Sequence, residues 1–139
     1  MTPGEPDLGR IVPVNKFDDA AVENLRRADK AAVVAQAGPL LEWLQDGNWP
    51  VAQEMSVILN DYTNDIKDAL LEVLRGDDGD WKYWCIIWVI RFTTAPRLDD
   101  ELLTELRRIA ELPSRGEQEH EPIAEAREVW EEWSAKNTE

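Results

Sequence analysis

A leucine-rich block recurs along the chain at the interval expected for pairs of helices. It reads Leu-Leu-Glu-Trp-Leu over residues 40–44 and Leu-Leu-Glu-Val-Leu over residues 70–74, and Leu-Leu-Thr-Glu-Leu over residues 102–106 is a looser copy. An acidic turn and a tryptophan, Trp49 or Trp81, follow each of the first two blocks. A period of about 30 residues is typical of arrays in which each helical pair packs on the next. The sequence therefore predicts a short stack of helical pairs.

The hydrophobic residues between these blocks recur at helical spacing, and no segment alternates cleanly between apolar and polar residues. We therefore predict an all-α protein of about seven helices, stacked as HEAT-like helical hairpins. Residues 17–139 are expected to form this single domain, and residues 1–16, which contain three prolines, an extended N-terminal arm. The segment 81–92 is apolar on nearly every face, which favours a helix buried on most sides.

Individual residues predict where these helices begin and break. Asp18 is the expected N-cap of the first helix, with Phe17 packing on Val22 as a hydrophobic staple. Pro39 is expected to break or kink a helix over residues 30–46, because proline lacks a backbone donor. The expected N-caps of later helices are Thr63 and Asp99.

Two tryptophan motifs carry a resemblance to a known family. They are Leu-Glu-Trp-Leu-Gln-Asp-Gly-Asn-Trp-Pro-Val-Ala at residues 41–52 and Trp-Lys-Tyr-Trp at residues 81–84, and the segment 13–18 fits the same pattern. Together they resemble a family of small, mostly bacterial proteins of unknown function over roughly residues 11–133. The resemblance implies a HEAT-like helical stack and transfers no activity.

Charge limits the classes of partner. The chain has 29 acidic and 15 basic residues, a net charge of −14, so it repels nucleic acid and anionic membranes and attracts basic proteins. No apolar run approaches the roughly 20 residues of a membrane span, and the N-terminus shows no secretory signal. The single Cys85 excludes an internal disulfide and a cysteine zinc site. We therefore expect a cytoplasmic protein that binds another protein, with neither nucleic acid nor a membrane as its partner.

The sequence offers little for catalysis. His120 is the only histidine, so its Glu-x-x-His spacing with Glu117 cannot supply the two such motifs of a di-iron site. The acidic loop 77–80 lacks the 12-residue ligand pattern of an EF-hand, and Cys85 lies in an apolar segment where its thiolate is disfavoured. We therefore expect no enzyme activity, no metal and no cofactor.

The candidate partner-binding residues lie at the two acidic turns and the tryptophans that follow them: Asp46, Asn48, Trp49, Asp77, Asp78, Asp80 and Trp81. Stacked repeats would place the two turns on the same edge as one acidic ridge. This ridge is either a solvated surface or a docking edge, and Trp49 and Trp81 are either wedges between repeats or exposed anchors. The expected core tryptophans are Trp43, Trp84, Trp88 and Trp130.

A non-enzymatic protein-interaction module is the function that these observations favour. One version is an acidic immunity or inhibitor protein that covers a basic partner, acting as a monomer or weak homodimer. Two alternatives stay open. One is a metal-dependent hydrolase that uses clustered carboxylates, and the other is a structural homo-oligomer that buries exposed tryptophans.

Overall fold

The computed structural model describes residues 9–120 and 122–138, in which every regular element is helical. The α-helices of these residues are α1 (Asp19–Arg27), α2 (Lys30–Ala35), α3 (Ala37–Glu42), α4 (Pro50–Leu59), α5 (Lys67–Arg75), α6 (Gly79–Trp84), α7 (Asp100–Glu111), α8 (Arg115–His120) and α9 (Ile123–Asn137). A 3-10 turn, η1 (Asn60–Tyr62), follows α4, and a π-helix, η2 (Cys85–Ile90), continues α6. The all-α class is confirmed, but the described part of the chain has nine α-helices instead of about seven.

Two segments account for the extra helices. The helix expected over residues 30–46 is divided at Gln36, the residue between α2 and α3, and not at Pro39. Pro39 instead lies in the first turn of α3, where a backbone N–H has no partner within the helix. The second extra helix is α8, a short helix between α7 and α9.

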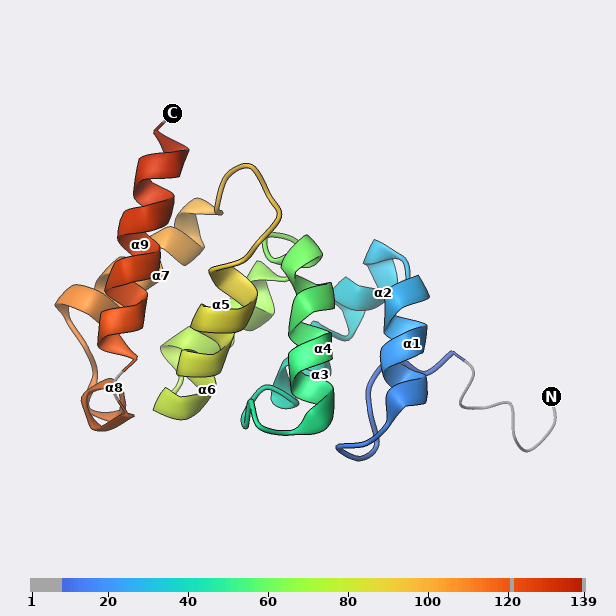
Figure 1. Ribbon diagram of the computed structural model, residues 1–139. Coiled ribbons are helices and arrows are strands. Elements are labelled where there is room, and N and C mark those ends of the chain that lie inside the picture. Colours follow the sequence, from blue (N-terminus) through green and yellow to red (C-terminus); the bar gives the residue numbers. More distant parts are fainter. Residues whose placement is uncertain (1–8, 121, 139) are drawn as a thin grey trace, which may run out of the picture.

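The helices lie in two rows (Figure 1). Neighbours contact each other in the order α1, α4, η2 and α9 along one row, and in the order α3, α5 and α7 along the other. The core lies between the rows. The leucines of the repeated blocks supply much of it, since Leu40, Leu41, Leu44, Leu70, Leu71, Leu74, Leu102 and Leu106 are all buried. The repeated leucines recognised in the sequence therefore face the core from the row of α3, α5 and α7.

Helix caps match the sequence at some positions and differ at others. Asp18 accepts a hydrogen bond from the Ala21 N–H, and Asp99 caps α7 by accepting from the N–H groups of Glu101 and Leu102. Thr63 is not the N-cap of the next helix, because α5 begins at Lys67 with Ile66 as its N-cap. Its buried hydroxyl donates to the backbone, at 3.1 Å from the Val89 carbonyl oxygen and 3.2 Å from that of Asn60.

The expected staple is also wrong, because the ring of Phe17 is largely exposed while Val22 is buried.

The π-helical segment is fastened by a buried amide. Asn60 Nδ2 donates to the carbonyl oxygens of Trp88 and Val89, at 2.7 and 3.0 Å. These contacts join the end of α4 to the end of η2, so the wide π turn keeps its carbonyls satisfied.

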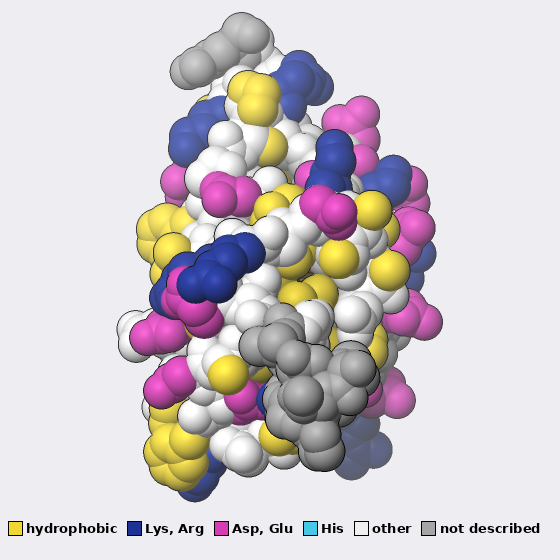
Figure 2. All heavy atoms as spheres, turned by 90° about the vertical axis from the view of Figure 1, so that its right-hand side faces the viewer, with side chains coloured by type: hydrophobic (Ala, Val, Ile, Leu, Met, Phe, Trp, Pro, Cys, Tyr) yellow, Lys and Arg dark blue, Asp and Glu magenta, His cyan; other side chains and the backbone are white. Residues whose placement is uncertain are grey.

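The N-terminal end of the array carries charges of both signs. Arg10 pairs with Asp18, and Ile11 is buried against the core. Figure 2 shows this end, where Lys and Arg side chains lie among Asp and Glu side chains with hydrophobic side chains between them. Residues 40–80, by contrast, include ten acidic and only two basic residues. The negative charge is therefore concentrated farther along the array.

Candidate functional site

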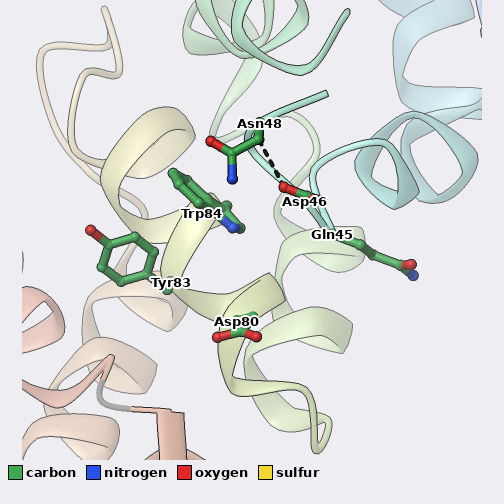
Figure 3. A pocket seen from close by; sticks show the side chains of 6 residues that line it. All are labelled: Gln45, Asp46, Asn48, Asp80, Tyr83 and Trp84. Atoms are coloured by element: carbon green, nitrogen blue, oxygen red, sulfur yellow. Dashed lines mark hydrogen bonds between the residues drawn. The ribbon is translucent and has the colours of Figure 1, made fainter. Parts of the chain in front are cut away.

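The first acidic turn and the start of α6 meet at one pocket. Its volume is about 460 Å³, and its lining comes from the turn after α3 and from α6: Gln45, Asp46, Asn48, Asp80, Tyr83 and Trp84 (Figure 3). Gly47 lies directly against Trp84, because a Cβ atom at Gly47 would fall 2.4 Å from the indole ring. We call this the corner pocket. It brings residues that follow two of the leucine-rich blocks onto a single surface.

The corner pocket combines carboxylates with aromatic rings. Asp46 Oδ1 accepts a hydrogen bond from the Asn48 N–H at 2.9 Å, and this bond shapes the turn. Among the described residues, no lysine or arginine nitrogen lies within 4.0 Å of the Asp46 carboxylate. Asp80 is exposed on the opposite side. Tyr83 meets Trp84 edge to face, with ring centroids 5.1 Å apart. Such a surface attracts a cationic group through both its charge and its π-faces.

The aromatic surface extends beyond the pocket. Trp84 packs against Trp88 with ring centroids 4.8 Å apart. Trp88 and Phe92 line an adjoining pocket of about 260 Å³ together with Val57 of α4. The exposed fractions of Phe92 and Val57 are 60% and 65%, so this is a partly open apolar face.

The other predicted site residues lie elsewhere. Asp78 caps α6 by accepting from the Trp81 N–H at 3.0 Å. Asp77 lies under α8, since a Cβ atom at Gly116 would fall 2.6 Å from its carbonyl oxygen. Asp46, Asn48 and Asp80 thus share the corner pocket, while Asp78 caps α6 and the side chain of Asp77 is exposed.

Trp49 and Trp81 both pack against the core and remain half-buried. The Trp81 indole Nε1 donates to the Leu41 carbonyl oxygen at 2.8 Å, which ties α6 to α3. Trp49 packs edge-on against Trp43 at 5.4 Å. Neither belongs to the corner pocket.

Of the four tryptophans expected in the core, Trp43, Trp88 and Trp130 pack against it, and Trp84 differs. Trp84 is half-buried and lines the corner pocket, while Trp43, Trp88 and Trp130 are half-buried at the edge of the core.

Sequence reasoning missed a buried ionic cluster behind the second turn. Lys82 of α6 and Glu117 of α8 are both inaccessible to solvent, and Lys82 Nζ lies 2.7 Å from Glu117 Oε2. The guanidinium of Arg108 in α7 donates two hydrogen bonds to the same carboxylate, at 2.7 and 3.0 Å. The Ser114 N–H donates to it at 2.6 Å. Burial alone would raise the pKa of Glu117, but the hydrogen bonds from Arg108, Lys82 and Ser114 outweigh it and lower that pKa to about 2.

A capping box could have revealed part of this cluster. Ser114 and Glu117 have the Ser-x-x-Glu spacing, and the Glu117 N–H donates to Ser114 Oγ at 3.3 Å. In the sequence, Glu117 stood out only through its spacing with His120, whose side chain lies outside the described residues. Because the Glu117 carboxylate is enclosed and fully hydrogen-bonded, its role is to hold α6, α7 and α8 together.

The remaining reactive groups form no recognisable centre in the part of the chain that the structure describes. No three His, Cys, Asp or Glu side chains there converge as metal ligands. Burial raises the pKa of the Cys85 thiol far above its usual range. Across residues 9–120 and 122–138, every helix is too short or too polar to cross a lipid bilayer.

The fold and the corner pocket define an all-helical protein whose most distinctive surface is acidic and aromatic. Comparison with known families places it more closely. The family described as Domain of unknown function (DUF5071) matches residues 11–130, and the chain belongs to this family. No curated protein matches the chain.

Proposed function

We propose that the protein is a cytoplasmic, non-enzymatic binding module that recognises a basic protein through the corner pocket. One form of this role is that of an immunity or inhibitor protein. We also propose that the two rows of helices are a short HEAT-like stack, which would explain why equivalent turns of successive repeats lie side by side.

The observation that carries the proposal is the joining of Asp46 and Asp80 with Trp84 in one pocket. A lysine or arginine side chain that enters it finds the Asp46 carboxylate to pair with and an aromatic ring to lie against. The net charge of −14 adds long-range attraction, which mainly raises the rate of encounter with a basic partner.

The test compares a corner-pocket variant with a charge-matched control. The pocket variant is Asp46→Asn/Asp80→Asn, and the control is Asp100→Asn/Glu131→Gln, which removes two exposed carboxylates on α7 and α9. Each protein is expressed in its own cells at the native level, cross-linked and purified, and the captured proteins are quantified by mass spectrometry. We expect a basic protein captured by the wild type and the control but lost from the pocket variant.

Trp84→Ala should lose the same protein, because the indole supplies the aromatic side of the pocket. If no captured protein depends on the corner pocket, the proposal is wrong.

A second candidate function is self-association through the aromatic face. Phe92 and Val57 are exposed beside Trp88, an arrangement that a copy of the chain would bury. Light scattering distinguishes the two, since self-association gives twice the 15.9 kDa monomer mass and Phe92→Ser should abolish it.

A further inference from the structure

A second open surface lies between α3 and α5, in the other row of helices. Two adjoining hollows of about 290 and 460 Å³ share Gly38, Ala69 and Glu72 in their lining, so they form one continuous trough. The trough extends from Val34 at one end to Trp81 at the other. It shares no lining residue with the corner pocket.

The floor of the trough is apolar and made largely of small residues: Ala37, Gly38, Leu41, Ala69 and Val73. A Cβ atom added to Gly38 would meet no atom within 4 Å, so the space above this residue is open. Trp81 closes one end, and its orientation is fixed by the hydrogen bond to the Leu41 carbonyl oxygen. Small side chains on two neighbouring helices leave room for a third helix to approach closely.

The rim of the trough is acidic on both sides. Asp65, Asp68 and Glu72 line the α5 side, and Glu42 lines the α3 side. Asp65 is paired with Lys30 at 3.7 Å. No described cation lies within 4.0 Å of the carboxylates of Asp68, Glu72 or Glu42. The trough therefore offers an apolar floor flanked by Asp68 and Glu72 on one side and Glu42 on the other, none of which is paired with a described cation.

We propose that this trough binds an amphipathic basic helix of a partner protein. The apolar face of that helix would lie over Gly38 and Ala69, and its flanking lysines and arginines would reach Asp68 and Glu72 on one side and Glu42 on the other. An apolar floor with charges along both edges is the complement of such a helix. Asp68 and Glu72 lie four residues apart on α5, which is about 6 Å along that helix, close to one helical turn of a bound segment. This surface goes beyond the proposed function, because it does not involve the corner pocket.

The probe is a synthetic peptide of about 14 residues in which leucines recur at helical spacing among lysines. A scrambled peptide of the same composition and charge lacks the apolar face and serves as its control. Binding to the full-length protein is measured by fluorescence anisotropy at low and at physiological ionic strength. We expect saturable binding of the amphipathic peptide, at least about tenfold tighter than that of the scrambled peptide.

Gly38→Leu is the decisive variant. Its Cβ would meet no atom within 4 Å, so the side chain would extend into the open space of the trough, and leucine favours a helix more than glycine does. We expect unchanged circular dichroism, a melting temperature at or above that of the wild type, and at least about tenfold weaker peptide binding.

Neutralising the rim tests the charges separately. Asp68→Asn/Glu72→Gln should weaken binding about two- to tenfold and lower its salt dependence, whereas Asp100→Asn/Glu131→Gln should leave both nearly unchanged. Equal binding of the two peptides, or undiminished binding to a folded Gly38→Leu variant, would overturn the proposal. A loss that follows Asp46→Asn/Asp80→Asn instead would assign the peptide to the corner pocket, which also overturns it.

Discussion

Replacing Glu117 by glutamine is the substitution with the largest expected effect on stability. The carboxylate accepts hydrogen bonds from Lys82, Arg108 and the Ser114 N–H, and neither it nor Lys82 is accessible to water. Glutamine would leave the ammonium of Lys82 buried without a counter-charge. Breaking a buried ion pair in this way costs about 3–5 kcal/mol. That is a large fraction of the roughly 5–15 kcal/mol by which domains are stable.

The lowered pKa of Glu117 gives a second magnitude for the same contacts. The pKa of Glu117 falls from 4.5 to about 2 on folding, which corresponds to about 3 kcal/mol of stability. A carboxyl group with a lowered folded-state pKa stabilises the protein at pH values above its unfolded-state pKa. This contribution is lost as the pH falls from about 4.5 to about 2. The difference in stability between the wild type and Glu117→Gln should therefore shrink over that interval.

Urea unfolding followed by tryptophan fluorescence measures both effects. At neutral pH we expect Glu117→Gln to lower the free energy of unfolding by about 3–5 kcal/mol. Lys82→Met should cost less, about 1–2 kcal/mol, because Arg108 and Ser114 still satisfy the carboxylate.

Glu119→Gln on the same helix is the matched control. Its only ion pair among the described residues is with the exposed Arg115, so we expect a change within about 0.5 kcal/mol. A loss below about 1 kcal/mol for Glu117→Gln, or one that does not vary with pH, would refute the reasoning.

Three further substitutions test other parts of the structure. Gly47→Ala should displace the Trp84 ring, since the added Cβ would fall 2.4 Å from it, and cost about 1–3 kcal/mol in urea unfolding with a shift in tryptophan emission. Asn60→Ala should cost about 1–3 kcal/mol and speed hydrogen exchange across residues 85–92, because alanine offers no replacement donor to the carbonyls of Trp88 and Val89. Asp18→Ala should cost about 1–2 kcal/mol in urea unfolding and make the chain near Arg10 more sensitive to proteolysis, because this side chain both caps α1 and pairs with Arg10.

The periodic leucines predicted the helical core because burial follows directly from helical spacing. Leu40 and Leu70 are both buried at equivalent positions of their repeats, as the pattern indicated. Pro39 shows that the sequence did not locate the break between two helices equally well. Proline is compatible with a first helical turn and incompatible with later ones, so the residue alone does not reveal on which side of it the helix breaks. The break falls before it, at Gln36.

The ionic cluster was beyond sequence reasoning for a different reason. Pro113 and Gly116 are typical of a helix end, and they concealed the short helix α8, which begins at Arg115 and includes Gly116. That helix is fixed by charges from α6 and α7, and such a tertiary contact has no periodic signature. The corner pocket depends likewise on the close approach of Gly47 to Trp84, which no local pattern encodes.

The segment formed by α6 and η2 is apolar on nearly every side but is not fully buried, because different faces of α6 contact different surroundings. Successive helical residues differ by roughly 100° in direction, so Asp80, Tyr83 and Trp84 fall on one arc, while Trp81 and Lys82 face away from it. Their partners follow these directions: the first three line the corner pocket, Trp81 lines the trough, and Lys82 meets the buried carboxylate of Glu117. One helix therefore forms a wall of both proposed binding surfaces while its third face is fixed by an ion pair. Loss of that ion pair should loosen the two surfaces together, whereas filling the trough at Gly38 should leave the corner pocket intact.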